Sequence, residues 1–162
     1  MRNFLYAIVL VALTGLVQAQ MVPPVNTNPT TVINGSVNPS LIPDALAMRL
    51  FASLTAANPT DSPATAATKV ATANSVGLST SDTAAMAVVL AAFQQNFQTF
   101  VNNYNQGATS QTQGNYNIFI AQRDNLATQL KANIETALSP TGAVQFDAFI
   151  QSEKTRITLS IQ

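Results

Sequence analysis

A heptad pattern constrains the fold of this chain more than any other feature of its sequence. Large apolar residues recur at alternating spacings of four and three: Met86, Leu90, Phe93, Phe97, Phe100 and Tyr104. This period of 3.5 residues places all of them along one stripe of a helix, and such a stripe needs a second helix opposite it. The pattern therefore predicts a long helix over about residues 80–104 and a helical partner for it.

The expected partner follows directly in the sequence. A polar turn over residues 105–114 leads into a second apolar stripe with helical spacing: Tyr116, Phe119, Ile120, Leu126, Leu130, Ile134 and Ala137. The helix so defined, about residues 113–137, is as long as the first, since at 1.5 Å per residue both measure about 37 Å. Equal helices joined by a short polar loop predict a long antiparallel helical hairpin.

Shorter helices are expected on both sides of the hairpin. Proline and capping residues indicate helices over about residues 41–57 and 62–75, and a last helix that begins with Ser139 as its N-cap. We therefore predict an all-α fold, a small helical bundle built on the hairpin, with residues 40–162 forming a single domain. The final residues, 157–162, alternate as a strand does but are too few to assign.

The N-terminal residues predict an export signal and a flexible arm. Residues 1–19 combine a positive charge, an apolar run and small residues before an expected cleavage site after Ala19, which indicates a signal peptide. The apolar run is shorter than the ~20 residues that span a bilayer, so we expect no stable membrane anchor after cleavage. Residues 20–39 are rich in proline and asparagine and predict a disordered, extended arm, in which Val32 and Ile33 could add a short strand. The protein is accordingly expected to be secreted or periplasmic.

Composition excludes several kinds of chemistry. The chain has no His, Cys or Trp, which removes thiol and imidazole nucleophiles, His-containing zinc sites and disulfides. Charged residues make up 9% of the chain, and the net charge of zero gives no basic surface for a nucleic acid. We predict no catalytic residue, no metal site and no cofactor, and we do not expect an enzyme.

Several of the few charged residues are expected at helix ends. Asp44, Asp61 and Asp82 each fall in the cap or first turn of a predicted helix, where an anion interacts favourably with free N–H groups. Lys131 and Glu135 are expected to pair on an exposed face. These placements leave few carboxylates for an acid–base pair.

Arg123 is the charged residue that lies on an apolar stripe. It falls between Phe119 and Leu126, next to an Asp124 that it is not expected to face. The simpler interpretation is that its stem covers apolar surface while the guanidinium reaches solvent or an aromatic ring. The functional alternative is an anchor for an anionic ligand. In that case the candidate ligand-binding residues are Arg123, Phe93, Phe97 and Phe119.

Asn and Gln make up twelve of the 24 residues from Gln94 to Asn117. Taken alone, this composition is typical of a self-associating segment. The aromatic residues among them keep helical spacing, however, so we interpret the amides as an uncharged polar helix face. A stacking surface for nucleic acid is not expected, because basic residues are missing.

Two helix openings in the sequence are related. Leu78-Ser79-Thr80-Ser81-Asp82 and Leu138-Ser139-Pro140-Thr141-Gly142 each place a leucine before a serine cap. Similar capping in two helices is the simpler interpretation. The openings also resemble the Leu-Thr-x-x-Gln motif of small periplasmic stress proteins of the Spy and CpxP kind, with Asp82 and Gly142 where that motif has Gln. The resemblance implies a helical hairpin with a chaperone-like role.

The leading function hypothesis is a non-enzymatic exported protein that acts through its surface as a binding, adaptor or structural module. Its expected partner is another protein or a second copy of the chain, since two nearly neutral surfaces do not repel each other electrostatically. One alternative is a carrier of a small apolar ligand held between the helices of the bundle. The other is a periplasmic chaperone-like helical hairpin.

Overall fold

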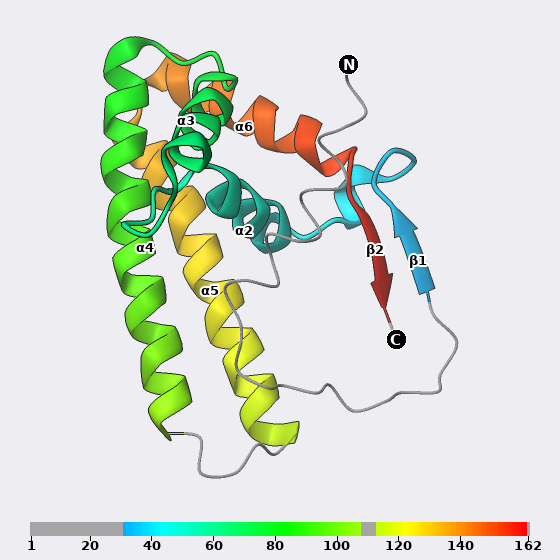
Figure 1. Cartoon of the computed structure of the whole chain (residues 1–162). Helices are drawn as coiled ribbons and strands as arrows, with labels where there is room; N and C mark the ends of the chain where they lie inside the picture. The colour runs from blue at the N-terminus through cyan, green and yellow to red at the C-terminus, as the bar shows by residue number, and fades with distance from the viewer. Residues whose placement is uncertain (1–30, 108–112, 162) are drawn as a thin grey trace.

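The computed structural model describes residues 31–107 and 113–161 (Figure 1). The elements follow in this order: strand β1 (Thr31–Asn34), 3-10 helix η1 (Pro39–Leu41), α2 (Asp44–Thr55), α3 (Pro63–Asn74), α4 (Thr80–Gly107), α5 (Gln113–Ala137), α6 (Pro140–Lys154) and strand β2 (Thr158–Ile161). The predicted all-α class is confirmed, with one small sheet added. The predicted signal peptide lies outside the described residues.

The long hairpin is formed by α4 and α5. These helices pack against each other, and the bounds of α5 are those that the sequence predicts (Figure 1). The helices α2, α3 and α6 lie beside one half of the hairpin, which contains the start of α4 and the end of α5, and the other half extends beyond them (Figure 1). We call this second half, residues 97–107 and 113–122, the distal hairpin. Among the described residues, no helix has the length and apolar character to cross a membrane.

The hydrophobic core lies where α2, α4, α5 and α6 meet. Its most deeply buried side chains come from all four helices: Met48, Met86, Leu130, Ile134, Phe146 and Ile150. Phe51 of α2 packs edge-on against Phe146 of α6, with ring centroids 5.4 Å apart. Burying one such side chain contributes about 1.5–3 kcal/mol. The core is therefore concentrated in the proximal half of the hairpin, which is the half opposite the distal hairpin.

A carboxylate joins the first turns of α4 and α6. Ser139 donates its backbone N–H to Asp82 Oδ1 and its hydroxyl to Asp82 Oδ2, and both donor–acceptor distances are 2.8 Å. Ser79, which caps α4, donates its hydroxyl to Oδ2 over 2.9 Å. The hydrogen bonds from Ser139 and Ser79 lower the pKa of the Asp82 carboxyl below its usual value, although burial opposes them. The two related helix openings therefore contact each other directly.

Gly142 leaves the space that the Asp82 carboxylate occupies. A Cβ atom on Gly142 would lie 2.6 Å from Asp82 Oδ2 and 3.2 Å from Ser139 Oγ. Glycine inside a helix costs about 1 kcal/mol relative to alanine. Here that cost is offset, because the missing side chain lets the carboxylate of α4 reach the first turn of α6.

A two-stranded sheet joins the ends of the described chain. β1 pairs antiparallel with β2, from Thr31 opposite Ile161 to Asn34 opposite Thr158. The arm that the sequence predicts over residues 20–39 thus ends in a paired strand and η1, whereas residues 20–30 lie outside the described residues. The sequence does not reveal this pairing, because each strand has four residues and its partner lies at the other end of the chain.

Gly142→Ala is expected to destabilise the domain by about 1–3 kcal/mol, because the added methyl group overlaps Asp82 and forces a shift in a packed site. At a helix position with free space around it, the same glycine-to-alanine change would stabilise the fold. Urea unfolding followed by circular dichroism measures the difference. In an Asp82→Ala background the loss should shrink or disappear. An equal loss in that background would show that Asp82 is not the obstacle.

Candidate functional site

A ladder of aromatic rings fills the seam of the distal hairpin. The ring centroids of Phe97 and Phe100 lie 6.1 Å apart on α4. Phe100 stacks on Phe119 of α5 with centroids 4.9 Å apart, and Tyr104 reaches the same ring at 4.4 Å. Ring pairs of this kind contribute about 0.5–1.5 kcal/mol beyond the area that they bury. The ladder therefore holds α4 and α5 together where the other helices do not cover them.

Two helices alone do not bury this ladder completely. Phe119 is 3% exposed. Four other rings of the distal hairpin are only half-buried: Phe97, Phe100, Tyr104 and Tyr116. Met86 and Leu90, which lie on the same stripe nearer the start of α4, are buried because α2 and α6 contribute to the core there. The distal hairpin thus retains partly exposed aromatic surface.

The same region carries no charge. Between Asp82 and Arg123 the sequence has no acidic or basic residue, so almost all of α4 and the first part of α5 are uncharged. Amide and hydroxyl side chains provide the polar surface instead. A molecule that approaches this region meets hydrogen-bonding groups without long-range electrostatic attraction or repulsion.

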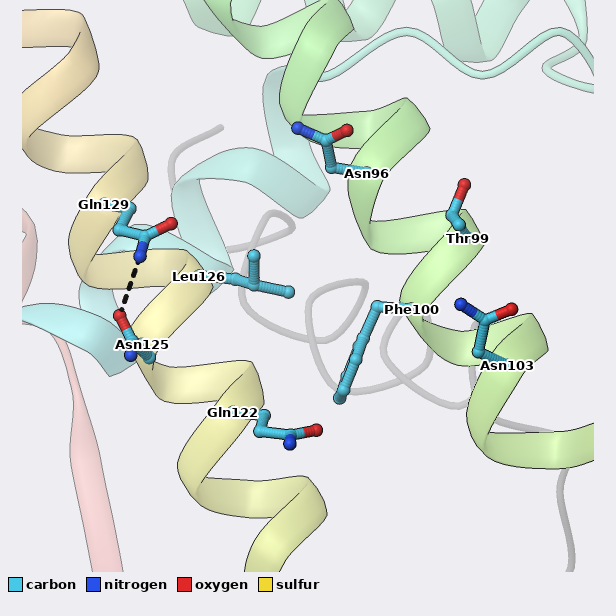
Figure 2. A pocket seen from close by; sticks show the side chains of 8 residues that line it. All are labelled: Asn96, Thr99, Phe100, Asn103, Gln122, Asn125, Leu126 and Gln129. Atoms are coloured by element: carbon cyan, nitrogen blue, oxygen red, sulfur yellow. Dashed lines mark hydrogen bonds between the residues drawn. The ribbon is translucent and has the colours of Figure 1, made fainter. Parts of the chain in front are cut away.

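One face of the hairpin forms an open groove of about 400 Å³ between α4 and α5 (Figure 2). Both helices contribute equally to its lining: Asn96, Thr99, Phe100 and Asn103 from α4, and Gln122, Asn125, Leu126 and Gln129 from α5. Spacings of three and four residues place each set on one face of its helix. Phe100 and Leu126 project into the space between the helices, and amides stand along both sides (Figure 2).

The other face of the hairpin also presents apolar side chains. On this side α2 packs against α5, and Arg49 Nη1 lies 3.3 Å from Asp124 Oδ1. One and two helical turns further toward the distal end, the same face of α5 presents Ile120 and Tyr116. Val101 lies on the corresponding flank of α4. All three side chains are half-buried, and we call this trio, Val101, Tyr116 and Ile120, the apolar face.

Arg123 pairs with its neighbour Asp124. Its Nε donates to Asp124 Oδ1 at a distance of 3.1 Å, and its Nη2 lies 3.0 Å from the same oxygen. The prediction that these two residues do not face each other is wrong, because the long arginine stem bends back along the helix surface to reach the carboxylate. Arg49 shares that oxygen, so one carboxylate serves two guanidinium groups and connects α2 with α5.

The four predicted ligand-binding residues do not meet in the groove. Phe93 and Phe97 stack with centroids 5.7 Å apart, Phe119 lies in the seam, and Arg123 is paired with Asp124. Phe100 is the ring of the ladder that lines the groove. The groove amides are not among the predicted ligand-binding residues, although their spacing in the sequence is regular. Asn96 and Asn103 are seven residues apart, as are Gln122 and Gln129.

The main charge cluster lies where α2, α5 and α6 meet. Lys131 Nζ lies 2.7 Å from Asp147, 2.9 Å from Glu135 and 3.5 Å from Asp44, which also pairs with the buried Lys154. The predicted Lys131–Glu135 pair forms, but Lys131 is 18% exposed rather than on an open face, since α2 and α6 bring two further carboxylates. Burial opposes the charge of Lys131, but the carboxylates outweigh it and raise the pKa of Lys131. These paired charges join three helices.

Comparison with known proteins adds no family and no relative. No protein-family model, no curated protein and no solved structure matches the chain. In the described parts of the chain, no group of three or more acidic side chains could hold a metal ion. The features that bear on function are therefore the half-buried rings and uncharged surface of the distal hairpin, and the amide-lined groove that extends from it into the proximal half.

The Asp44 ion pairs predict sensitivity to acid. Burial acts to raise the pKa of Asp44, but its hydrogen bond to Lys154 and the charges of Lys154 and Lys131 outweigh burial and hold that pKa below 3.8. Such a group stabilises the fold above its unfolded pKa, and the contribution is lost as the pH falls through the folded pKa. We expect the free energy of unfolding to decrease below about pH 4, and Asp44→Asn to flatten that decrease.

Urea unfolding at a series of pH values between about 2 and 6 tests this expectation. Asp61 and Asp82 also have lowered pKa values, so the Asp44→Asn variant should keep part of the slope. Glu153→Gln is the control, because Glu153 near the end of α6 pairs with Arg156 just beyond that end, and this pair does not join two helices. A slope in Asp44→Asn equal to that of the unmodified chain would contradict the role of these ion pairs.

Proposed function

We propose that this chain is a non-enzymatic exported protein that associates with a second copy of itself through the distal hairpin. The observation that carries the proposal is the apolar face. Val101, Tyr116 and Ile120 are half-buried on a stretch of α4 and α5 that extends beyond α2 (Figure 1). The sequence of residues 1–19 supports export.

A second copy suits this face for two reasons. The sequence between Asp82 and Arg123 has no charge, so two identical surfaces do not repel each other. A two-fold contact also places a surface against its own copy, so the apolar side chains of one hairpin meet the same set on the other. Two hairpins packed in this way form a four-helix arrangement that covers each ladder of rings.

The geometry gives the alternatives less support. A carrier of a small apolar molecule needs a cavity that encloses most of its ligand. The rings of Phe100 and Phe119 stack in the seam, however, and the groove beside them is open and lined by amides. A chaperone-like hairpin would share the exposed apolar surface, but it would bind unfolded chains instead of forming a defined dimer.

The mature chain, beginning at Gln20, is expected to form dimers in sedimentation experiments at micromolar concentrations. Val101→Lys should weaken the dimer by at least about tenfold, because it places an unpaired charge in the contact. The lysine stem can carry its ammonium group to solvent in the monomer, so the fold should survive. Sedimentation velocity over a range of concentrations measures both species.

Val88→Lys is the matched control. It introduces the same change on the same helix, but Val88 is 71% exposed and lies in the proximal half. This variant should dimerise as the unmodified chain does, and thermal unfolding should show that both variants are folded. A mature chain that stays monomeric at every concentration would contradict the proposal, as would an equal loss of dimer in the two variants.

A further inference from the structure

We infer that the amide-lined groove between α4 and α5 binds a neutral, hydroxyl-rich ligand, namely a segment of an oligosaccharide chain. The groove lies on the face of the hairpin opposite the apolar face, so this inference does not rest on self-association. Its basis is the chemistry of the eight lining side chains and their arrangement in Figure 2.

The amides match the hydrogen-bonding pattern of sugar hydroxyls. Each amide offers a carbonyl acceptor and two N–H donors, and each hydroxyl can both donate and accept. Asn96 and Asn103 stand on one side of the groove, and Gln122 and Asn125 stand on the other (Figure 2). Gln129 donates to Asn125 Oδ1 over 3.1 Å, which orients that amide. A ligand in the groove therefore meets donors and acceptors from two sides.

The lining also argues against charged and apolar ligands. No lining residue is charged, so an ionic ligand would find no opposite charge there. Arg123 does not supply one, since its guanidinium is paired with Asp124. An apolar ligand would displace water from the amides without replacing its hydrogen bonds, at a cost of about 1–3 kcal/mol for each group left unsatisfied. A neutral polar ligand avoids both costs.

Phe100 favours a sugar over a peptide. Its ring stacks on Phe119 with an interplanar angle of 16°, which holds it in place, and its side chain lines the groove opposite Leu126 (Figure 2). The face of an aromatic ring carries partial negative charge and attracts the C–H groups on the flat face of a sugar ring. An extended peptide backbone would satisfy the amides but would offer no such face. Since the ring is already ordered, little entropy is lost on binding.

The dimensions suit a short segment of a longer chain. From Asn96 to Asn103, and from Gln122 to Gln129, each helix contributes about 10 Å of wall. The volume of about 400 Å³ lies within the usual range for small-ligand sites. Because the groove is open, a chain can enter and leave without a terminal sugar being enclosed.

Titration of the folded mature chain with neutral hexasaccharides tests the inference. The probes are cellohexaose, maltohexaose and fully N-acetylated chitohexaose, with an oligogalacturonide as the anionic counterpart. Side-chain amide NMR signals of the groove should shift with at least one neutral probe and less with the anionic one. Asn103→Ala and Gln122→Ala should each weaken binding by about tenfold, as expected for the loss of one hydrogen bond that leaves its partner unsatisfied.

Asn102→Ala is the matched control, because Asn102 is an exposed amide on the same helix that does not line the groove. It should bind as the unmodified chain does, and so should Val101→Lys, which separates this site from the dimer contact. The inference is overturned if none of the neutral probes shifts the groove amides, or if Asn102→Ala weakens binding as much as Asn103→Ala. Tighter binding of the anionic probe, or of a neutral Gly-Ser hexapeptide, would also overturn it.

Discussion

The hydrogen bonds between Asp82 and Ser139 determine how the bundle is assembled. They connect the first turn of α4 with the first turn of α6, so the end of α5 must return to the level where α4 begins. With that end closed, α6 and α2 pack beside the same half of the hairpin and the core forms there. The opposite end of α4 and α5 is held by aromatic rings between two helices (Figure 1).

The two halves of the hairpin consequently differ in the kind of side chains that they carry. The proximal half supplies Lys131 of α5, which pairs with Asp44 of α2, and buried apolar side chains that pack against α2 and α6. Asp44 also pairs with Lys154 of α6, and these contacts stabilise the fold. The distal half has rings, amides and no charge. The two faces of the hairpin differ, since one forms an amide-lined groove that extends into the proximal half and the other presents Val101, Tyr116 and Ile120.

Local signals in the sequence predict the helices, whereas contacts between elements are not visible in it. The bounds of α5 and the cap of α6 at Ser139 follow from heptad spacing and capping residues, which act within one helix. The pairing of β1 with β2 and the surroundings of Lys131 depend on other elements, so the sequence does not reveal them. The groove amides have regular spacing, but the same spacing is typical of any solvated helix face. They line a common groove because the structure places α4 and α5 side by side.

The two-stranded sheet has a consequence for the order of folding. Pairing Thr31 with Ile161 closes almost the whole described chain into a loop, at a cost in chain entropy of about 4 kcal/mol. An isolated pair of short strands is at best marginally stable and does not offset that cost. The strands can therefore pair only after η1 has packed on α6 and brought them together. The sheet is the last element to form and the first to open, and its opening leaves the helical core intact.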